Sequence, residues 1–178
     1  MSAKFVFRCR ASGVAAQWLF SQRFIDTDVD RARWRTTLDY RVTPRLQLGL
    51  EYNPGANELA PRGNWFAQTE TDTRPGIIFG VSSDRIGTPS GQAYFVTFSK
   101  QVGASAFAPY VSLNYSGHDR EFNFPFGASL GLSRNWTLTP MYDGRRGHTT
   151  LTWSGEQTSL TLIAAFNRRF GLSLGRNF

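Results

Sequence analysis

Two histidines are the residues of this chain whose chemistry could most directly serve catalysis. His118 precedes Asp119, and His148 ends the segment 143–148, which begins with Asp143 and contains two arginines. An imidazole held by a carboxylate can act as a general base, but a hydrolase also needs a nucleophile placed against it. No motif of that kind surrounds either histidine. Solvated loop histidines are the plainer interpretation, and we predict no catalytic residue.

The sequence contains few residues that could bind a metal ion or form a disulfide. The chain has one cysteine, Cys9, which cannot form an intramolecular disulfide. The two histidines lie 30 positions apart (118 and 148), without the cysteine or carboxylate spacing of a metal site. We therefore predict no metal and no cofactor.

A ladder of arginines over residues 31–42 supports a more specific functional hypothesis than the histidines or the cysteine do. The odd positions hold Arg31, Arg33, Arg35, Thr37, Asp39 and Arg41, and the even positions hold Ala32, Trp34, Thr36, Leu38, Tyr40 and Val42. This period of two is typical of a strand with one polar and one apolar face. If the polar face lines a barrel, its charged residues and Glu51 of the next strand form a basic wall that favours anions. A partly exposed strand with solvated charges is the alternative.

Strands must position this ladder, because the same alternation continues along most of the chain. Thr43-Pro44-Arg45 predicts a tight turn into a strand over residues 46–53, and residues 122–133 alternate without interruption. A first strand is expected near residues 14–24, and a helix over residues 14–25 is the alternative. From residue 44 onward, glycine and proline interrupt the runs about every ten residues, as in a succession of short antiparallel strands.

Composition limits the class of protein. A chain of 178 residues predicts one domain, 1–178, in which residues 1–13 are expected to be a disordered or residual N-terminal segment. No run approaches the 18 apolar residues of a membrane-spanning helix. The net charge is +7, yet only Lys4 and Lys100 among the 20 basic residues are lysine, and no basic run suggests a nucleic-acid tail. We expect no nucleic-acid partner.

The polar face favours a membrane barrel over a soluble one. Small residues dominate it: Gly127, Ser129, Gly131, Ser133, Thr150, Thr152, Ser154, Gly171, Ser173 and Gly175. A soluble surface normally carries lysine and glutamate, whereas a confined lumen suits small polar groups. Trp34 and Tyr40 lie six residues apart on one apolar face, about 20 Å along a strand, which approaches the spacing of two interfacial aromatic girdles. We predict an all-β fold, an antiparallel up-and-down transmembrane barrel of about 12 strands, in a range of about 8 to 14.

The last nine residues carry a family resemblance. Phe170, Leu172 and Leu174 alternate on one face, and the segment ends at Phe178. It resembles the C-terminal strand of bacterial outer-membrane β-barrel proteins, whose final aromatic residue and alternating apolar positions form the signal for the barrel assembly machinery. Arg176 departs from the apolar residue usual at its position. The resemblance implies a bacterial outer-membrane location with the lipid bilayer and the assembly machinery as partners, although residues 1–20 do not read as a signal peptide.

Three functions remain open from the sequence. The leading one is a small passive pore or a structural membrane component, whose interior favours small anionic solutes through Arg31, Arg33, Arg35, Asp39, Arg41 and Glu51. A second is an enzyme embedded in the barrel that acts at the loops. A third is a soluble β-barrel or sandwich that binds an apolar or anionic ligand.

Overall fold

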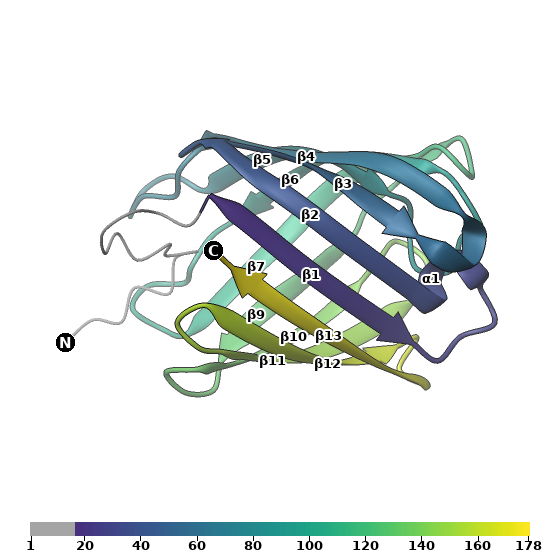
Figure 1. Ribbon diagram of the computed structural model, residues 1–178. Coiled ribbons are helices and arrows are strands. Elements are labelled where there is room, and N and C mark those ends of the chain that lie inside the picture. The colour runs from purple at the N-terminus through teal and green to yellow at the C-terminus, as the bar shows by residue number, and fades with distance from the viewer. Residues whose placement is uncertain (1–16) are drawn as a thin grey trace.

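The computed structural model describes residues 17–178, so Cys9 and the N-terminal segment 1–13 lie outside the described residues. Within residues 17–178 the chain is all-β and forms a closed antiparallel barrel of 12 strands (Figure 1). The fold class predicted from the alternation is therefore confirmed. The strands of the first half are β1 (Trp18–Ile25), β2 (Trp34–Thr43), β3 (Leu46–Asn53), β4 (Glu58–Gln68), β5 (Gly76–Ser83), β6 (Gln92–Ser99) and β7 (Phe107–Ser116). Those of the second half are β8 (Glu121–Asn123), β9 (Phe126–Gly131), β10 (Trp136–Tyr142), β11 (Gly147–Ser154), β12 (Thr158–Ala165) and β13 (Arg169–Asn177).

Closure comes from pairing the first strand with the last. β1 lies between β2 and β13 over most of its length, and the other strands pair with their neighbours along the chain, except that β8 and β9 both pair with β7. A closed ring leaves no strand edge free for intermolecular pairing. The barrel therefore satisfies its backbone groups without help from a second sheet.

One barrel strand is interrupted. β8 pairs with residues 114–116 of β7 and β9 pairs with residues 107–111, so β8 and β9 together make one strand of the 12. Phe124 and Pro125 separate them, and proline has no N–H to give to the ladder. The expectation of an unbroken strand over residues 122–133 was wrong here, because the period of two runs through the proline unchanged.

The connection between β1 and β2 contains a single helical turn, α1 (Asp30–Arg33). The backbone N–H groups of Ala32 and Arg33 both donate to the carbonyl of Val29, and Arg33 pairs with Asp30 at 3.9 Å. The prediction that Arg31 and Arg33 belong to the strand ladder was therefore wrong. Residues 30–33 still carry an arginine at every second position, although they form a helical turn. The period of two in the sequence therefore could not reveal the turn. A second short turn, η1 (Pro54–Ala56), joins β3 to β4.

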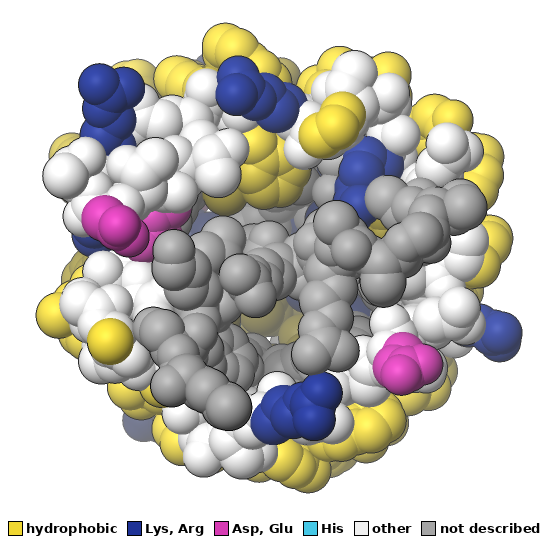
Figure 2. All heavy atoms as spheres, turned by 90° about the vertical axis from the view of Figure 1, so that its left-hand side faces the viewer, with side chains coloured by type: hydrophobic (Ala, Val, Ile, Leu, Met, Phe, Trp, Pro, Cys, Tyr) yellow, Lys and Arg dark blue, Asp and Glu magenta, His cyan; other side chains and the backbone are white. Residues whose placement is uncertain are grey.

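The barrel carries its apolar side chains on the outside. On β3, Leu48, Leu50 and Tyr52 are 49%, 53% and 42% exposed, whereas Glu51 and Asn53 are 0% and 1% exposed. An end-on view shows apolar side chains around the circumference (Figure 2). The polar faces of the strands line the interior instead, the reverse of a soluble core.

The C-terminal strand follows the same rule. Phe170 and Leu174 of β13 are 60% and 53% exposed, Leu172 is half-buried, and Phe178, just beyond the strand, is 58% exposed. Their role as an assembly signal remains a prediction. Among the helices of residues 17–178, none has the length and apolar character needed to cross a bilayer.

Candidate functional site

The inner wall formed by β1 to β4 gathers the charged residues of the barrel. Arg35 and Asp39 of β2 and Glu51 of β3, all expected in this wall, share it. Arg35 Nη1 lies 3.7 Å from Glu51 Oε2. Glu51 Oε1 accepts hydrogen bonds from Asn53 at 3.2 Å and from the Ser83 hydroxyl. A carboxylate that is 0% exposed is thus held by three side chains.

A second ion pair on the same wall joins two strands that are separated by a third, which has a glycine at this position. Asp39, Gly49 and Arg62 stand opposite one another on β2, β3 and β4. Arg62 Nε lies 3.1 Å from Asp39 Oδ1. A Cβ on Gly49 would overlap Asp39 Oδ1, so only glycine leaves the space through which the two side chains meet.

Arg23 of β1 adds a third guanidinium to this wall. It is 8% exposed and stands directly opposite Arg35 in the β1–β2 register. Among the described residues, no ion pair involves Arg23, and its Nε has no hydrogen-bond partner. Arg41 continues β2 beyond Asp39 and is half-buried.

The opposite end of the barrel from the C-terminus is closed by the β5–β6 loop, residues 84–91, hereafter the crossing loop. Arg31 of α1, which is 3% exposed, holds this loop. Its Nε donates to Thr88 O at 2.9 Å, and its Nη2 donates to Asp84 O at 2.9 Å and to Arg85 O at 2.6 Å. Arg31 therefore serves as a clamp on the loop instead of lining a strand.

The base of the crossing loop is tied to the β7–β8 turn. Asp84 Oδ2 accepts hydrogen bonds from the Ser116 hydroxyl at 2.5 Å and from the His118 N–H at 3.2 Å. Gly91, at the other end of the loop, has φ +108°, and a Cβ there would lie 2.8 Å from His118 N. Only glycine fits this approach, so the loop is anchored at both ends.

The tip of the crossing loop reaches the far wall. Ile86 packs against a buried cluster of Ile25, Ile163 and Ala165, together with Phe166. Ile163 and Ala165 belong to β12, which is separated from β6 by β7, β9, β10 and β11, and from β5 by β4, β3, β2, β1 and β13. The loop therefore spans the bore from one wall to roughly the opposite one.

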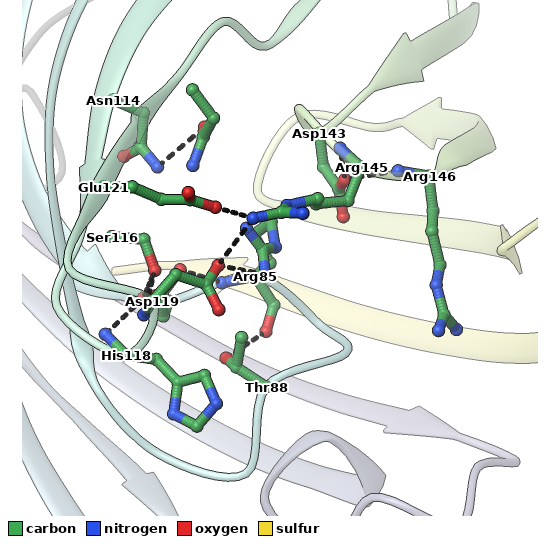
Figure 3. A network of polar contacts seen from close by, with 12 residues as sticks. Arg85, Thr88, Asn114, Ser116, His118, Asp119, Glu121, Asp143, Arg145 and Arg146 are labelled. Carbon is green, nitrogen blue, oxygen red and sulfur yellow. Dashed lines mark hydrogen bonds and ion pairs between the residues drawn. The ribbon is translucent and has the colours of Figure 1, made fainter.

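A charged network rims the closed end (Figure 3). Arg85 Nη2 of the crossing loop lies 2.5 Å from Asp119 Oδ2, while Arg145 pairs with Glu121 and lies 3.9 Å from the same Asp119 oxygen. A pocket of about 340 Å³ opens among these groups, lined by Arg85, Gly87, Asp119, Asp143, Arg145, Arg146 and Phe166. Arg146 lies over the Phe166 ring, 4.7 Å from its centroid. Most charges here already have partners.

His148 is fully engaged in structural contacts. Its Nε2 lies 2.8 Å from Asp143 Oδ2, and its Nδ1 accepts the N–H of Phe166 at 3.2 Å. Since Nδ1 accepts, Nε2 carries the proton and donates it to the carboxylate. Burial opposes ionisation of Asp143, but the hydrogen bonds from His148 and from the N–H groups of Arg145 and Arg146 outweigh it and lower the pKa of Asp143. No ring nitrogen is left to take a proton from a substrate in this arrangement.

The other histidine stands apart. His118 is exposed at the β7–β8 turn and enters the network through its backbone N–H. Within residues 17–178, no group of three or more histidine, cysteine, aspartate or glutamate residues is arranged to hold a metal ion.

Sequence reasoning missed Arg23, Arg62 and the crossing loop. Arg23 and Arg62 occupy inward positions of strands that carry few charged residues. Each is the single arginine on the inward face of its strand. In the loop, the signal is the glycines and proline of residues 84–91, which are typical of a turn but do not indicate its direction. No protein-family model matches this chain, and no curated protein is similar to it.

Proposed function

We propose that this chain is an outer-membrane β-barrel that acts as a small passive pore for anions, restricted at one end by the crossing loop. The observation that carries the proposal is the apolar exterior of a closed barrel with a polar, charged interior. Fully covering a leucine or phenylalanine side chain is worth about 1.5–3 kcal/mol, so leaving a ring of them in water is costly. A bilayer covers them all at once.

The aromatic residues support two membrane interfaces. Trp18 packs on Tyr40 near one end of β1 and β2, with centroids 4.7 Å apart, and Phe24 packs on Trp34 near the other end, at 4.9 Å. These pairs face each other in the β1–β2 register, six residues apart. Amphipathic rings at both strand ends are typical of the headgroup regions of a bilayer.

The interior supports a preference for anions. On the inward faces of β1 to β4, four arginines (Arg23, Arg35, Arg41 and Arg62) face three carboxylates (Asp39, Glu51 and Glu58), so this wall has one excess positive charge (four against three). In a narrow lumen with low-dielectric walls, such a charge attracts anions and repels cations. The crossing loop limits the size of what passes.

The test uses the purified protein in detergent and in planar bilayers. We expect a compact gel band in unheated samples that shifts on boiling, loss of solubility without detergent, and rare, small conductance events with a reversal potential that favours anions. Arg62→Gln should reduce that preference, and the exposed loop variant Arg134→Gln, which removes the same charge, should not. A chain that stays monomeric and soluble without detergent contradicts the membrane assignment.

A further inference from the structure

Arg23 and Arg35 form a pair of like charges inside the barrel. Their Cα atoms are partners across the β1–β2 ladder, and both side chains belong to the inward face. Like charges placed directly opposite each other in a sheet are destabilising. Such a pair needs negative charge close by.

The described residues place too little negative charge beside this pair of arginines. Arg35 reaches Glu51 only at 3.7 Å, which is an ion pair without a short hydrogen bond, and the Nε atoms of both Arg23 and Arg35 have no hydrogen-bond partner. The other oxygen of Glu51 is occupied by Asn53 and Ser83. Asp39 is paired with Arg62, and Glu58, whose Oε2 is buried without a hydrogen-bond partner, lies on β4, three strands away from Arg23. Among the described residues, Arg23 is therefore left without a carboxylate partner of its own.

The remaining segment of the chain cannot supply a carboxylate side chain either, because residues 1–16 contain no aspartate or glutamate. An ionised group that is nine-tenths buried and unpaired is costly to keep. An oxyanion fits the need, because a guanidinium presents its N–H donors in a planar fork that matches carboxylate and phosphate oxygens.

Small polar residues lie beside the two arginines on the inner wall. Ser173 of β13 is the partner of Arg23 on its other side, and it lies between Gly171 and Gly175 on the inward face. Ser21 and Thr37 bond to each other at 2.8 Å and project no long side chain. Arg23 therefore has small polar neighbours toward β13 and toward Ser21, whereas Ile25 follows it on the inward face.

We propose that Arg23 and Arg35 form a discrete binding site for one small oxyanion, a carboxylate or a phosphate, within the lumen. The proposal deepens the proposed anion pore and rests on it: the pore attracts anions generally, and this site binds one of them saturably. Arg23 supplies the unpaired fork, and Glu51 limits the site to one ligand by neutralising part of the charge on Arg35.

The experiment titrates the detergent-solubilised full chain with inorganic phosphate and, separately, with acetate at constant ionic strength, using chloride as the balancing ion. The unfolding temperature is read from the heat-modifiable gel shift. We expect a saturable rise with phosphate and with acetate, because a ligand that binds only the folded state stabilises it in proportion to ln(1 + [L]/Kd). Arg23→Gln should weaken binding about tenfold or more, and Arg23→Lys, which keeps the charge but loses the fork, should weaken it by a smaller factor.

Two controls keep the result interpretable. Arg134→Gln removes one exposed positive charge and should leave the phosphate titration unchanged. Arg23→Gln also removes the unpaired charge, so this variant should fold at least as well as wild type in chloride, and loss of binding is then not loss of folding.

The outcomes separate this proposal from the pore. A detergent-dependent barrel with anion-selective conductance but no saturable response to phosphate or acetate overturns the binding site and leaves the pore intact. A response of equal size in wild type and Arg23→Gln overturns it as well. A soluble chain that needs no detergent contradicts the pore, whatever the titration gives.

Discussion

The residue with the most specific local chemistry is His148, and its contacts make it a brace of the closed end. Both ring nitrogens are used, one by Asp143 Oδ2 at 2.8 Å and the other by the N–H of Phe166. The brace joins the β10–β11 turn to the β12–β13 turn. The absence of a catalytic residue stays a prediction, although these contacts leave His148 without a free ring nitrogen.

This brace predicts an acid-sensitive closed end. The pKa of Asp143 is lowered in the folded chain, so its contribution to stability is present above its unfolded value, about 3.9, and is lost as the pH falls through the folded value. Asp143→Asn should cost about 1–2 kcal/mol at pH 7, and the gap between variant and wild type should shrink as the pH drops below about 4. Urea unfolding in detergent at several pH values measures both. The exposed Glu156→Gln should show no such gap at pH 7.

Gly49 shows how a single small residue shapes the wall. It stands between Asp39 and Arg62, whose side chains meet over it. Gly49→Ala should separate the ion pair and destabilise the barrel by about 1–3 kcal/mol, because a buried charge loses part of its partner. The same change in an Arg62→Gln background, where no ion pair exists to be separated, should cost less. An equal loss in the two backgrounds would refute the role of the ion pair.

At the scale of elements, the crossing loop is the part of the fold on which the proposed pore depends. Arg31 holds it through three carbonyl oxygens and the Thr88 hydroxyl, and Ile86 seats its tip on the far wall. Hydrogen bonds from a charged donor are worth about 1.5–3 kcal/mol each when buried, so the clamp is strong. The loop closes the end by specific contacts with three other connections.

Releasing the clamp should open the proposed pore. Arg31→Ala is expected to raise the frequency of conducting events at least tenfold in planar bilayers, since it removes about 2 kcal/mol or more from the closed arrangement. Arg33→Ala, in the same turn but exposed, should leave conductance unchanged. If Arg31→Ala folds and shows no more conductance than wild type, the barrel is a structural membrane component, not a pore.

At the scale of the whole molecule, the exterior should respond to charge as a lipid-facing surface does. Leu50 is 53% exposed near the middle of β3. In a bilayer, Leu50→Arg should cost about 2–4 kcal/mol of barrel stability, whereas on a water-exposed surface such a change stays within about 0.5 kcal/mol. Leu132→Arg, in the exposed β9–β10 loop, is the matched control. Folding into liposomes followed by urea unfolding measures both, and a small effect at Leu50 would argue for the soluble alternative.

Much of the barrel follows from the local pattern. Alternation along residues 46–53 assigned Leu48 and Leu50 to one face and Glu51 to the other, and those faces are the exposed and the buried ones. A period of two is a property of each strand alone, so it survives whatever the strand packs against. The same logic placed Arg35 and Asp39 together, but it extended one turn too far, to Arg31 and Arg33.

The partnerships across the barrel depend on the order in which strands close. Arg62 meets Asp39 from two strands away, Arg31 clamps a loop more than 50 residues further along, and Ile86 reaches β12 across the bore. Local propensity carries no information about such pairs, because strand stagger and ring closure bring them together only once the sheet has curled. Alternation therefore settles which way each side chain faces, while closure of the ring determines which charges meet and which end is shut.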